Sequence, residues 1–281
     1  MRYLRKQPLK KHCSIKIGGP ADYFCQPKNV SDLKDAIMFA HEKKLPIMIL
    51  GAGSNLLFCD EGFKGLVIKL VKGLDWVRVV RTKVTVGSGV LLSKLLSNLI
   101  KNKLGGLEFL VGIPGTIGGA VVMNAGAWSK EIGQFVDSIK VLDKSGKEKV
   151  FKRKNLGFAY RRSVLQKNDF VVTEVSLRLR KSKKSVILKK IKEFMERRKG
   201  RQPLGIPNSG SVFKNPKGAF AGKLIEEAGC KGLRVGDAQV SEKHANFIVN
   251  LGEAKASDVI KLMSRVQKAV KIKLEPEIVI I

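Results

Sequence analysis

The stretch Val111–Trp128 reads VGIPGTIGGAVVMNAGAW, and five of its eighteen residues are glycine. None of its side chains is charged. Because glycine has no Cβ, such a main chain can adopt positive φ angles and approach a flat or anionic ligand closely. An ordinary surface loop is richer in Ser, Asp and Lys. The stretch therefore predicts main chain that faces a ligand, and the rest of the sequence has to indicate which one.

A second glycine-containing segment, Gly51–Leu56 (GAGSNL), follows the apolar run Pro46–Leu50, which predicts a buried strand. It lacks the last glycine of the Rossmann GxGxxG fingerprint and the Lys-Ser/Thr pair of a P-loop. Its consecutive main-chain N–H groups can still form an anion-binding nest, and a tight exit from the strand is the alternative interpretation. Two glycine-rich cradles in one α+β region favour a large cofactor with a pyrophosphate, such as FAD.

The chain has 281 residues, is 44% hydrophobic, and carries 54 Lys and Arg against 24 Asp and Glu, a formal charge of +30. This length allows one large domain or two, and the apolar content predicts a folded core. The excess charge is typical of proteins that bind nucleic acid, anionic membranes or anionic substrates. A lysine-rich but merely solvated surface is the alternative. Aromatic residues make up only 6%, which disfavours a basic and aromatic nucleic-acid surface.

The four cysteines form no CxxC pair, and there are only three histidines, so neither a zinc site nor a disulfide framework is expected. The basic N-terminal residues are not followed by an apolar run, so we expect no signal peptide. No apolar run reaches the roughly 18 residues of a membrane span. The simplest expected location is the cytoplasm.

Short strands and helices alternate along the first two thirds of the chain. Leu91–Lys103 has the spacing of an amphipathic helix, and Ser138–Phe151 has that of a hairpin turning at Ser145-Gly146. The helical stretch Ser185–Arg201 is dense in charge, which places a domain boundary near residue 184. Helices and strands follow it, ending in a predicted strand at Leu274–Ile281. The pattern predicts an α+β fold with a smaller second domain at residues 184–281.

Three polar side chains outside the glycine segments are candidates for chemistry. Arg161 lies beside Tyr160 and can hold an anion or stabilise developing negative charge, although adjacent arginines are usually surface charge. Ser211 has no histidine near it in sequence, so a hydroxyl that donates a proton is favoured over a nucleophile. A purely structural serine is the alternative there.

The third candidate is Glu277. Period-2 alternation along Leu274–Ile281 places it on one face with Glu275, Val279 and Ile281. Beside those apolar side chains we expect it to be half buried, which raises a carboxyl pKa and favours a proton donor. An exposed edge strand with a protective charge is the alternative.

Seven motifs taken together resemble one family. They are IGGPADYF (17–24), GAGSNLLF (51–58), GIPGTIGGAVVMNAGAW (112–128), the pair Tyr160-Arg161, GSVFKNP (210–216), AGKLIEEAG (221–229) and LEPEI (274–278). In this order, and from about His12 to the end, they are similar to the UDP-N-acetylenolpyruvoylglucosamine reductases, flavoenzymes of peptidoglycan precursor synthesis. Each motif alone is unspecific, whereas the ordered set is highly specific.

The resemblance implies an FAD-binding domain of the vanillyl-alcohol-oxidase type at residues 1–183. It consists of two α+β subdomains, about 1–72 and 73–183, and a C-terminal substrate-binding domain follows at 184–281. FAD would be bound noncovalently, with NADPH as reductant and no metal. The implied cofactor-binding residues are Gly51, Ala52, Gly53, Ser54, Asn55, Leu56, Gly112, Pro114, Gly115, Thr116, Gly118, Gly119, Asn124, Ala125 and Gly126.

The resemblance also implies an activity: hydride from NADPH passes through FAD to the enolpyruvyl group of UDP-N-acetylglucosamine enolpyruvate, giving UDP-N-acetylmuramate. The catalytic residues of the family correspond to Arg161, Ser211 and Glu277, and the chemistry of the three side chains agrees. The implied substrate-binding residues are Tyr160, Arg198, Arg201, Asn215 and Lys231. The short spacing from Arg161 to Ser211 matches the shorter class of the family, which lacks an inserted tyrosine-bearing loop.

Two departures from the family pattern concern binding positions: Ala52 replaces a common Gly, and Arg201 stands where Lys is frequent. We expect a monomer or weak dimer with no specific nucleic-acid partner. Another flavoenzyme of the same fold, such as a sugar or lactone oxidase, is the first alternative. It would share the glycine segments but not the combination of Arg161, GSVFKNP and Glu277. A basic nucleic-acid-binding protein is the second alternative.

Overall fold

The computed structural model describes residues 1–167 and 170–281 and divides the chain into two compact units. The first unit contains Met1–Leu4, Tyr23–Ala52 and Gly65–Arg197, and the second contains Arg5–Asp22, Gly53–Lys64 and Arg198–Ile281. This division differs from the predicted single boundary at residue 184, because two early segments group with the C-terminal residues. The predicted domain limits 1–183 and 184–281 stay a prediction.

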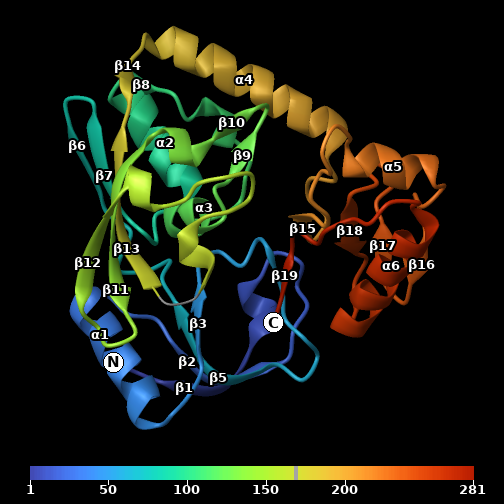
Figure 1. The fold of residues 1–281 in the computed structure, drawn as a ribbon, viewed down its shortest axis with the longest axis horizontal. Coiled ribbons are helices and arrows are strands. Elements are labelled where there is room, and N and C mark those ends of the chain that lie inside the picture. Colours follow the sequence, from blue (N-terminus) through green and yellow to red (C-terminus); the bar gives the residue numbers. More distant parts are fainter. Residues whose placement is uncertain (168–169) are drawn as a thin grey trace. The chain divides into compact units, whose positions relative to one another are not determined.

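An antiparallel five-stranded sheet forms the centre of the first unit (Figure 1). Its order is β12 (Glu148–Lys152), β11 (Val136–Asp143), β13 (Phe170–Arg178), β7 (Lys83–Gly87) and β6 (Val77–Val80). Helices α2 (Leu92–Lys101) and α3 (Ile117–Val122) contribute apolar side chains to the core of this sheet. Leu92, Leu95, Leu96 and Leu99 of α2 are buried at helical spacing, so the predicted amphipathic helix is confirmed.

A second core in the first unit lies under α1 (Val30–Glu42). Asn29 caps this helix by accepting the Asp32 N–H over 2.9 Å. The helix packs with β3 (Ile47–Leu50) and β5 (Phe63–Lys69), which pair in parallel. The sheet order is β1 (Leu4–Pro8), β2 (Pro20–Cys25), β5, β3. The sequence thus leaves β3 directly into Gly51, at the carboxyl end of a parallel strand.

Short elements connect these layers. They are the pairs β8 (Leu104–Gly105) with β14 (Arg180–Lys181) and β9 (Gly126–Ala127) with β10 (Lys130–Glu131), and 3-10 turns at Glu108–Leu110, Ile132–Gln134, Arg153–Asn155 and Val164–Lys167. A further 3-10 turn, at Leu9–His12, belongs to the second unit. The charged helix predicted at Ser185–Arg201 is α4 (Lys184–Arg201).

The second unit contains an antiparallel sheet in the order β15 (Asn208–Ser211), β18 (Phe247–Asn250), β17 (Ala238–Val240) and β16 (Arg234–Val235). Helix α6 (Ala256–Ala269) packs on β16 and β17, and α5 (Ala221–Glu227) follows β15 in sequence. A further pair is parallel and joins β19 (Val279–Ile280) to β4 (Leu56–Leu57). The C-terminal strand therefore completes a sheet begun more than 200 residues earlier in the sequence.

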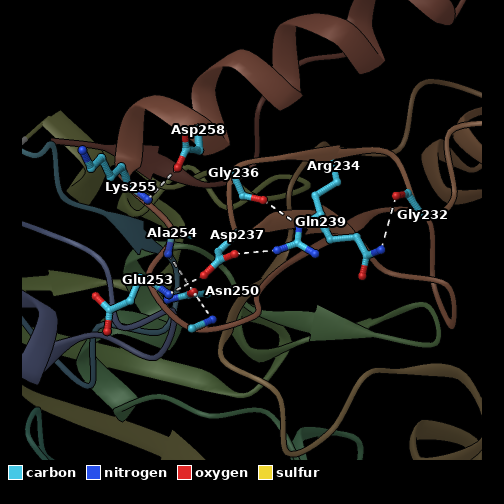
Figure 2. A network of polar contacts seen from close by, with 11 residues as sticks. Gly232, Arg234, Gly236, Asp237, Gln239, Asn250, Glu253, Ala254, Lys255 and Asp258 are labelled. Atoms are coloured by element: carbon cyan, nitrogen blue, oxygen red, sulfur yellow. Dashed lines mark hydrogen bonds and ion pairs between the residues drawn. The ribbon is translucent and has the colours of Figure 1, made fainter.

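A polar network ties the β16–β17 hairpin to the start of α6 (Figure 2). Asp237 accepts from Arg234 Nη2 through Oδ1 and from the Glu253 N–H through Oδ2. The Asn250 side chain accepts the Ala254 N–H over 3.1 Å. These contacts fix the hairpin ends, so the sheet that carries β15 is supported from its far edge.

Candidate functional site

The glycine-rich segment is anchored by its main chain to the connection between β7 and α2. Leu92 N–H donates to the Gly115 carbonyl over 3.0 Å, and Gly118 N–H donates to the Ser88 carbonyl over 2.9 Å. A Cβ added at Gly118 would lie 2.9 Å from Ser88 Cβ, closer than real Cβ contacts come. Gly118 is therefore required for this close approach of two main-chain segments.

The opposite side of the same segment is open. Gly112, Pro114 and Gly119 are exposed. A Cβ added at Gly119 would meet, among the described residues, only Thr116 Oγ1 within 4 Å, at 3.6 Å. Thr116 is itself buried and accepts the Gly119 N–H through Oγ1, which caps α3. Main chain left bare of side chains over this length fits a flat dinucleotide, as the sequence predicts.

The Gly51–Leu56 segment crosses from the first unit to the second, and each part is held within its own unit. In the first, a Cβ added at Gly51 would lie 2.6 Å from Thr116 Oγ1, so Gly51 contacts the glycine-rich segment directly. Ala52 beside it is partly exposed. The two predicted cradles therefore meet at Gly51 and Thr116.

In the second unit, Gly53 has a φ of 67°, and a Cβ there would lie 2.3 Å from the His12 carbonyl oxygen. Ser54 and Asn55 are partly exposed. Leu56 begins β4 and pairs with Val279. Only glycine fits at position 53, because both the backbone conformation and the space exclude a side chain.

Asn124 is fully buried and its side chain is engaged inside the first unit. Its Nδ2 donates to Glu131 Oε2 over 2.8 Å and to the Ala159 carbonyl over 2.9 Å, and its Oδ1 accepts the Gly133 N–H over 3.0 Å. Ala125 and Gly126, which follow it, are partly buried. The predicted cofactor contact of Asn124 stays a prediction, and the structure adds an internal role.

Arg161 lies in a two-residue turn of the first unit. Ala159 and Arg162 exchange both main-chain hydrogen bonds, of 3.1 and 2.9 Å, around Tyr160 and Arg161. The Arg161 guanidinium lies 4.9 Å from the Tyr160 ring centroid, and its Nη2 donates to the Gly126 carbonyl over 3.1 Å. The guanidinium is thus directed toward the end of the glycine-rich segment, as a charge-stabilising arginine near a cofactor would be.

Ser211 and Glu277 are brought together in the second unit. Val212, the residue after Ser211, accepts the Glu277 N–H over 2.8 Å, and the bridge between Phe213 and Pro276 continues the antiparallel pairing. Both Ser211 and Glu277 are partly buried. Residues 66 positions apart in sequence therefore lie on neighbouring hydrogen-bonded segments, and the predicted half-buried position of Glu277 is confirmed.

The predicted continuous strand at Leu274–Ile281 is wrong. Only Val279–Ile280 forms a strand, and Val279 is 38% exposed rather than buried beside Glu277. The buried positions are Leu274 and Ile278. Pro276 faces Phe213 at a position that needs no N–H, because Glu275 and Glu277 make the hydrogen bonds on either side of it. The chain pairs first with residues 212–214 and then with β4, so its faces do not alternate with a period of two.

The five predicted substrate-binding residues are in different environments. Tyr160 is 44% exposed, and Arg201 is also exposed. The Asn215 Oδ1 accepts the Ala221 N–H over 3.0 Å, and Lys231 Nζ forms an ion pair with Glu226. Arg198 is only 6% exposed, and burial lowers its pKa to about 10. Tyr160, Arg201 and Lys231 therefore have accessible side chains, whereas the side chain of Arg198 is buried.

His244 belongs to the polar environment of Lys231 and was missed in the sequence. Burial is the first cause that lowers its pKa; the positive charges of Lys231 and Arg201 add to this, and Glu226 opposes it. Its Nδ1 accepts the Asn246 N–H over 3.2 Å. No spacing rule singles out a lone histidine, so only the fold places it beside the predicted cations.

Among residues 1–167 and 170–281, no group of three or more His, Cys, Asp or Glu side chains is placed to hold a metal ion. Within the same residues, no helix is both long and apolar enough to cross a membrane.

Comparison with known proteins gives two family models. The FAD-binding domain matches residues 21–151, and the C-terminal domain of UDP-N-acetylenolpyruvoylglucosamine reductase matches residues 202–281. The reductase 2 of Symbiobacterium thermophilum is 46% identical over 281 residues, covering 99% of this chain and 91% of the relative. The chain belongs to the UDP-N-acetylenolpyruvoylglucosamine reductase family.

Other comparisons agree with this family. The UDP-N-acetylenolpyruvoylglucosamine reductase of Desulforamulus reducens is 46% identical over 94% of this chain and 88% of its own length. The crystal structure of the reductase from Thermus caldophilus superimposes with a TM-score of 0.87 at 39% identity, covering 99% of this chain and 98% of that one. The resemblance read from the ordered motifs is therefore confirmed.

Cholesterol oxidase from Brevibacterium sterolicum shares the fold alone, with a TM-score of 0.51 at 17% identity over 63% of this chain. Together with the reductase structure, it confirms the predicted α+β fold, with an FAD-binding domain of the vanillyl-alcohol-oxidase type and a smaller C-terminal domain. The roles of the site residues stay predictions.

Proposed function

We propose that this protein reduces the enolpyruvyl group of UDP-N-acetylglucosamine enolpyruvate to UDP-N-acetylmuramate, with NADPH as reductant and FAD as bound cofactor. The 46% identity to a reductase along 99% of the chain carries this proposal, because it includes both the cofactor domain and the C-terminal domain. The position of Glu277 beside Ser211 supports it further, since the reaction needs polar groups gathered at one carbon.

Bound FAD would supply the redox chemistry, accepting a hydride from NADPH and passing it to the vinyl carbon of the substrate. The main chain of Gly51–Leu56 and of Gly112–Gly126 would hold it. Gly119 and Gly112 contribute exposed main chain, and Gly51 and Thr116 join the two segments. The protein supplies placement, and its side chains then act on the substrate.

Hydride addition leaves negative charge on the adjacent carbon and on its carboxylate. We assign Arg161 to stabilise this charge, since its guanidinium is permanently positive. Ser211 would deliver the proton to the carbanion carbon, and its hydroxyl suffices because the charged intermediate is a strong base. Glu277 would stabilise the same intermediate as a hydrogen-bond donor when protonated.

We assign Tyr160, Arg198, Arg201, Asn215 and Lys231 to the UDP-sugar. The diphosphate carries the charge that Arg201 and Lys231 would neutralise. Arg198 is buried in the last turn of α4, so it would act on the UDP-sugar indirectly, by holding this turn in place. Since the substrates are NADPH and a sugar nucleotide, we place the protein in the cytoplasm. We also propose that it is a monomer or weak dimer.

An anaerobic visible spectrum tests the function. NADPH is added to the purified yellow protein first, and UDP-N-acetylglucosamine enolpyruvate second. Bleaching by NADPH and recovery of colour only with the sugar nucleotide would support both half-reactions. Bleaching without recovery would keep the fold and the cofactor but contradict the substrate, and would favour another flavoenzyme of this fold. A protein that takes up no FAD would contradict the cofactor assignment.

A further inference from the structure

The turn that carries Arg161 has an unusual backbone. Arg161 has a φ of 53°, in the left-handed region that residues other than glycine rarely adopt. Such a conformation persists only where the surroundings hold it, and it recurs at functional sites. The side chains of Gln166, Asn124 and Ser163 hold this turn in the first unit.

Two primary amides donate to the carbonyls at the two ends of the Tyr160-Arg161 turn. Gln166 Nε2 donates to the Arg161 carbonyl over 2.9 Å, and Asn124 Nδ2 donates to the Ala159 carbonyl, also over 2.9 Å. Gln166 Nε2 also lies 3.5 Å from Met123 Sδ, at the end of α3. Both ends of the turn are thus fastened to the glycine-rich segment or its neighbours.

The hydroxyl of Ser163 adds a third link, since its Oγ donates to the Val122 carbonyl over 2.6 Å. The Arg161 guanidinium itself contacts the Gly126 carbonyl. The turn and the segment Val122–Gly126 therefore form one hydrogen-bonded body, in which a shift of the Arg161 carbonyl would also move its guanidinium.

We propose that Gln166 is a positioning residue for Arg161: its amide fixes the left-handed backbone and so aims the guanidinium, while Asn124 holds the other side of the turn. The proposal rests on the role assigned to Arg161 in the proposed function. Gln166 touches no substrate in it and acts only through the Arg161 carbonyl.

The test uses Gln166, because Asn124→Ala would leave the partly buried Glu131 without its amide partner and endanger folding. Gln166→Met keeps the side-chain length but removes the donor, and Gln166→Lys restores a donor. Gln239→Met is the matched control, since Gln239 Nε2 donates to the Gly232 carbonyl over 3.3 Å in the second unit (Figure 2).

Two measurements are made on each variant. The first is amide hydrogen exchange of a peptide spanning residues 156–166 in the FAD-free protein, which reports the Ala159 and Arg162 N–H groups. The second is the pair of half-reactions followed by flavin absorbance, with NADPH and then with UDP-N-acetylglucosamine enolpyruvate.

In Gln166→Met we expect exchange in this peptide to be about 5- to 10-fold faster, and colour recovery with the sugar nucleotide to be slower by the same factor. Bleaching by NADPH should stay within about twofold, Gln166→Lys should restore recovery, and Gln239→Met should match the wild type.

Unchanged exchange and recovery in Gln166→Met would overturn the proposal, and so would an equal loss of both half-reactions with loss of bound FAD. A wild-type protein that ignores the sugar nucleotide would contradict the proposed function instead. In that case the exchange measurement would still decide whether Gln166 holds the turn.

Discussion

Asn55 donates from Nδ2 to the main-chain carbonyl of Glu277 over 3.1 Å, across 222 residues of sequence. The contact lies next to the parallel pairing of Leu56 with Val279. Asn55, in the Gly51–Leu56 segment, thus fixes the position of the main chain at Glu277. A residue predicted to bind the cofactor also positions a proposed catalytic carboxyl.

Replacing Asn55 by Ala should therefore affect folding and one half-reaction. We expect the free energy of unfolding to fall by about 1 kcal/mol, because one hydrogen bond is lost and the Glu277 carbonyl loses a partner. Colour recovery with the sugar nucleotide should slow more than bleaching by NADPH. Urea denaturation and stopped-flow absorbance measure the two effects. Asn98→Ala, which removes an exposed amide contact on α2, is the control. Equal effects in both variants would contradict the special role of Asn55.

Ser211 and Ser209 provide a matched pair in β15. Ser211→Ala should slow colour recovery by about 100-fold or more while leaving NADPH-driven bleaching intact, because only the second step needs its proton. Ser209 is buried and its Oγ donates to the Leu56 carbonyl over 3.1 Å. Ser209→Ala should lower stability with little change in either half-reaction. Rapid-mixing absorbance separates the steps. Equal loss of both half-reactions in Ser211→Ala would argue against the proton-donor role.

Gly118 and Gly119 test the cofactor cradle without turnover. Gly119→Ala should keep or slightly raise the thermal stability of the FAD-free protein, because Ala favours a helix by about 1 kcal/mol over Gly and the site has room. It should nevertheless weaken FAD binding about tenfold or more by covering exposed main chain. Gly118→Ala should destabilise the protein itself through its clash with Ser88. Fluorescence titration with FAD and thermal unfolding distinguish the two, and unchanged FAD affinity in Gly119→Ala would contradict the cradle.

His244 should make stability depend on pH. Its pKa in the folded protein lies below the usual 6.5, first because of burial and then because of Lys231 and Arg201. As pH falls through about 6.5, the unfolded chain takes up a proton that the folded protein does not, so unfolding becomes more favourable. The wild type should therefore lose more stability than His244→Gln between about pH 7 and 5. Urea denaturation at several pH values measures this, and parallel curves would refute it.

Local patterns predicted the elements whose burial follows a simple period. Helix α2 was predicted because its buried leucines share one face. The hairpin of β11 and β12 was predicted because its two strands pair with each other and are close in sequence. The last strand was not, since residues 275–277 pair with residues 212–214 and Val279–Ile280 pairs with β4, two partners that no local rule reveals. The ordered motifs identified Ser211 and Glu277 as candidates, but only the fold shows them on adjacent hydrogen-bonded segments.

The amides that hold the Arg161 turn were missed for a different reason. Asn124 contacts Ala159 across 35 residues, and Gln166 has no spacing signature of its own. Hydrogen bonds between a side chain and a distant carbonyl depend on the final fold and leave no periodicity in the sequence. Arg198 shows the converse: the family resemblance implied that it binds the substrate, whereas its burial depends on the fold and is not readable from the sequence.

The second unit consists of three separated stretches of the chain. Within it, β4 from the middle stretch pairs with β19 from the C-terminal stretch. During synthesis, more than two hundred residues are added after Asn55–Leu57 before the strand that pairs with them has been made. Such non-local pairing slows folding, because a long loop closes before the contact is gained. Nascent chains of this protein therefore expose an unpaired strand edge for most of their elongation, the kind of surface that chaperones protect.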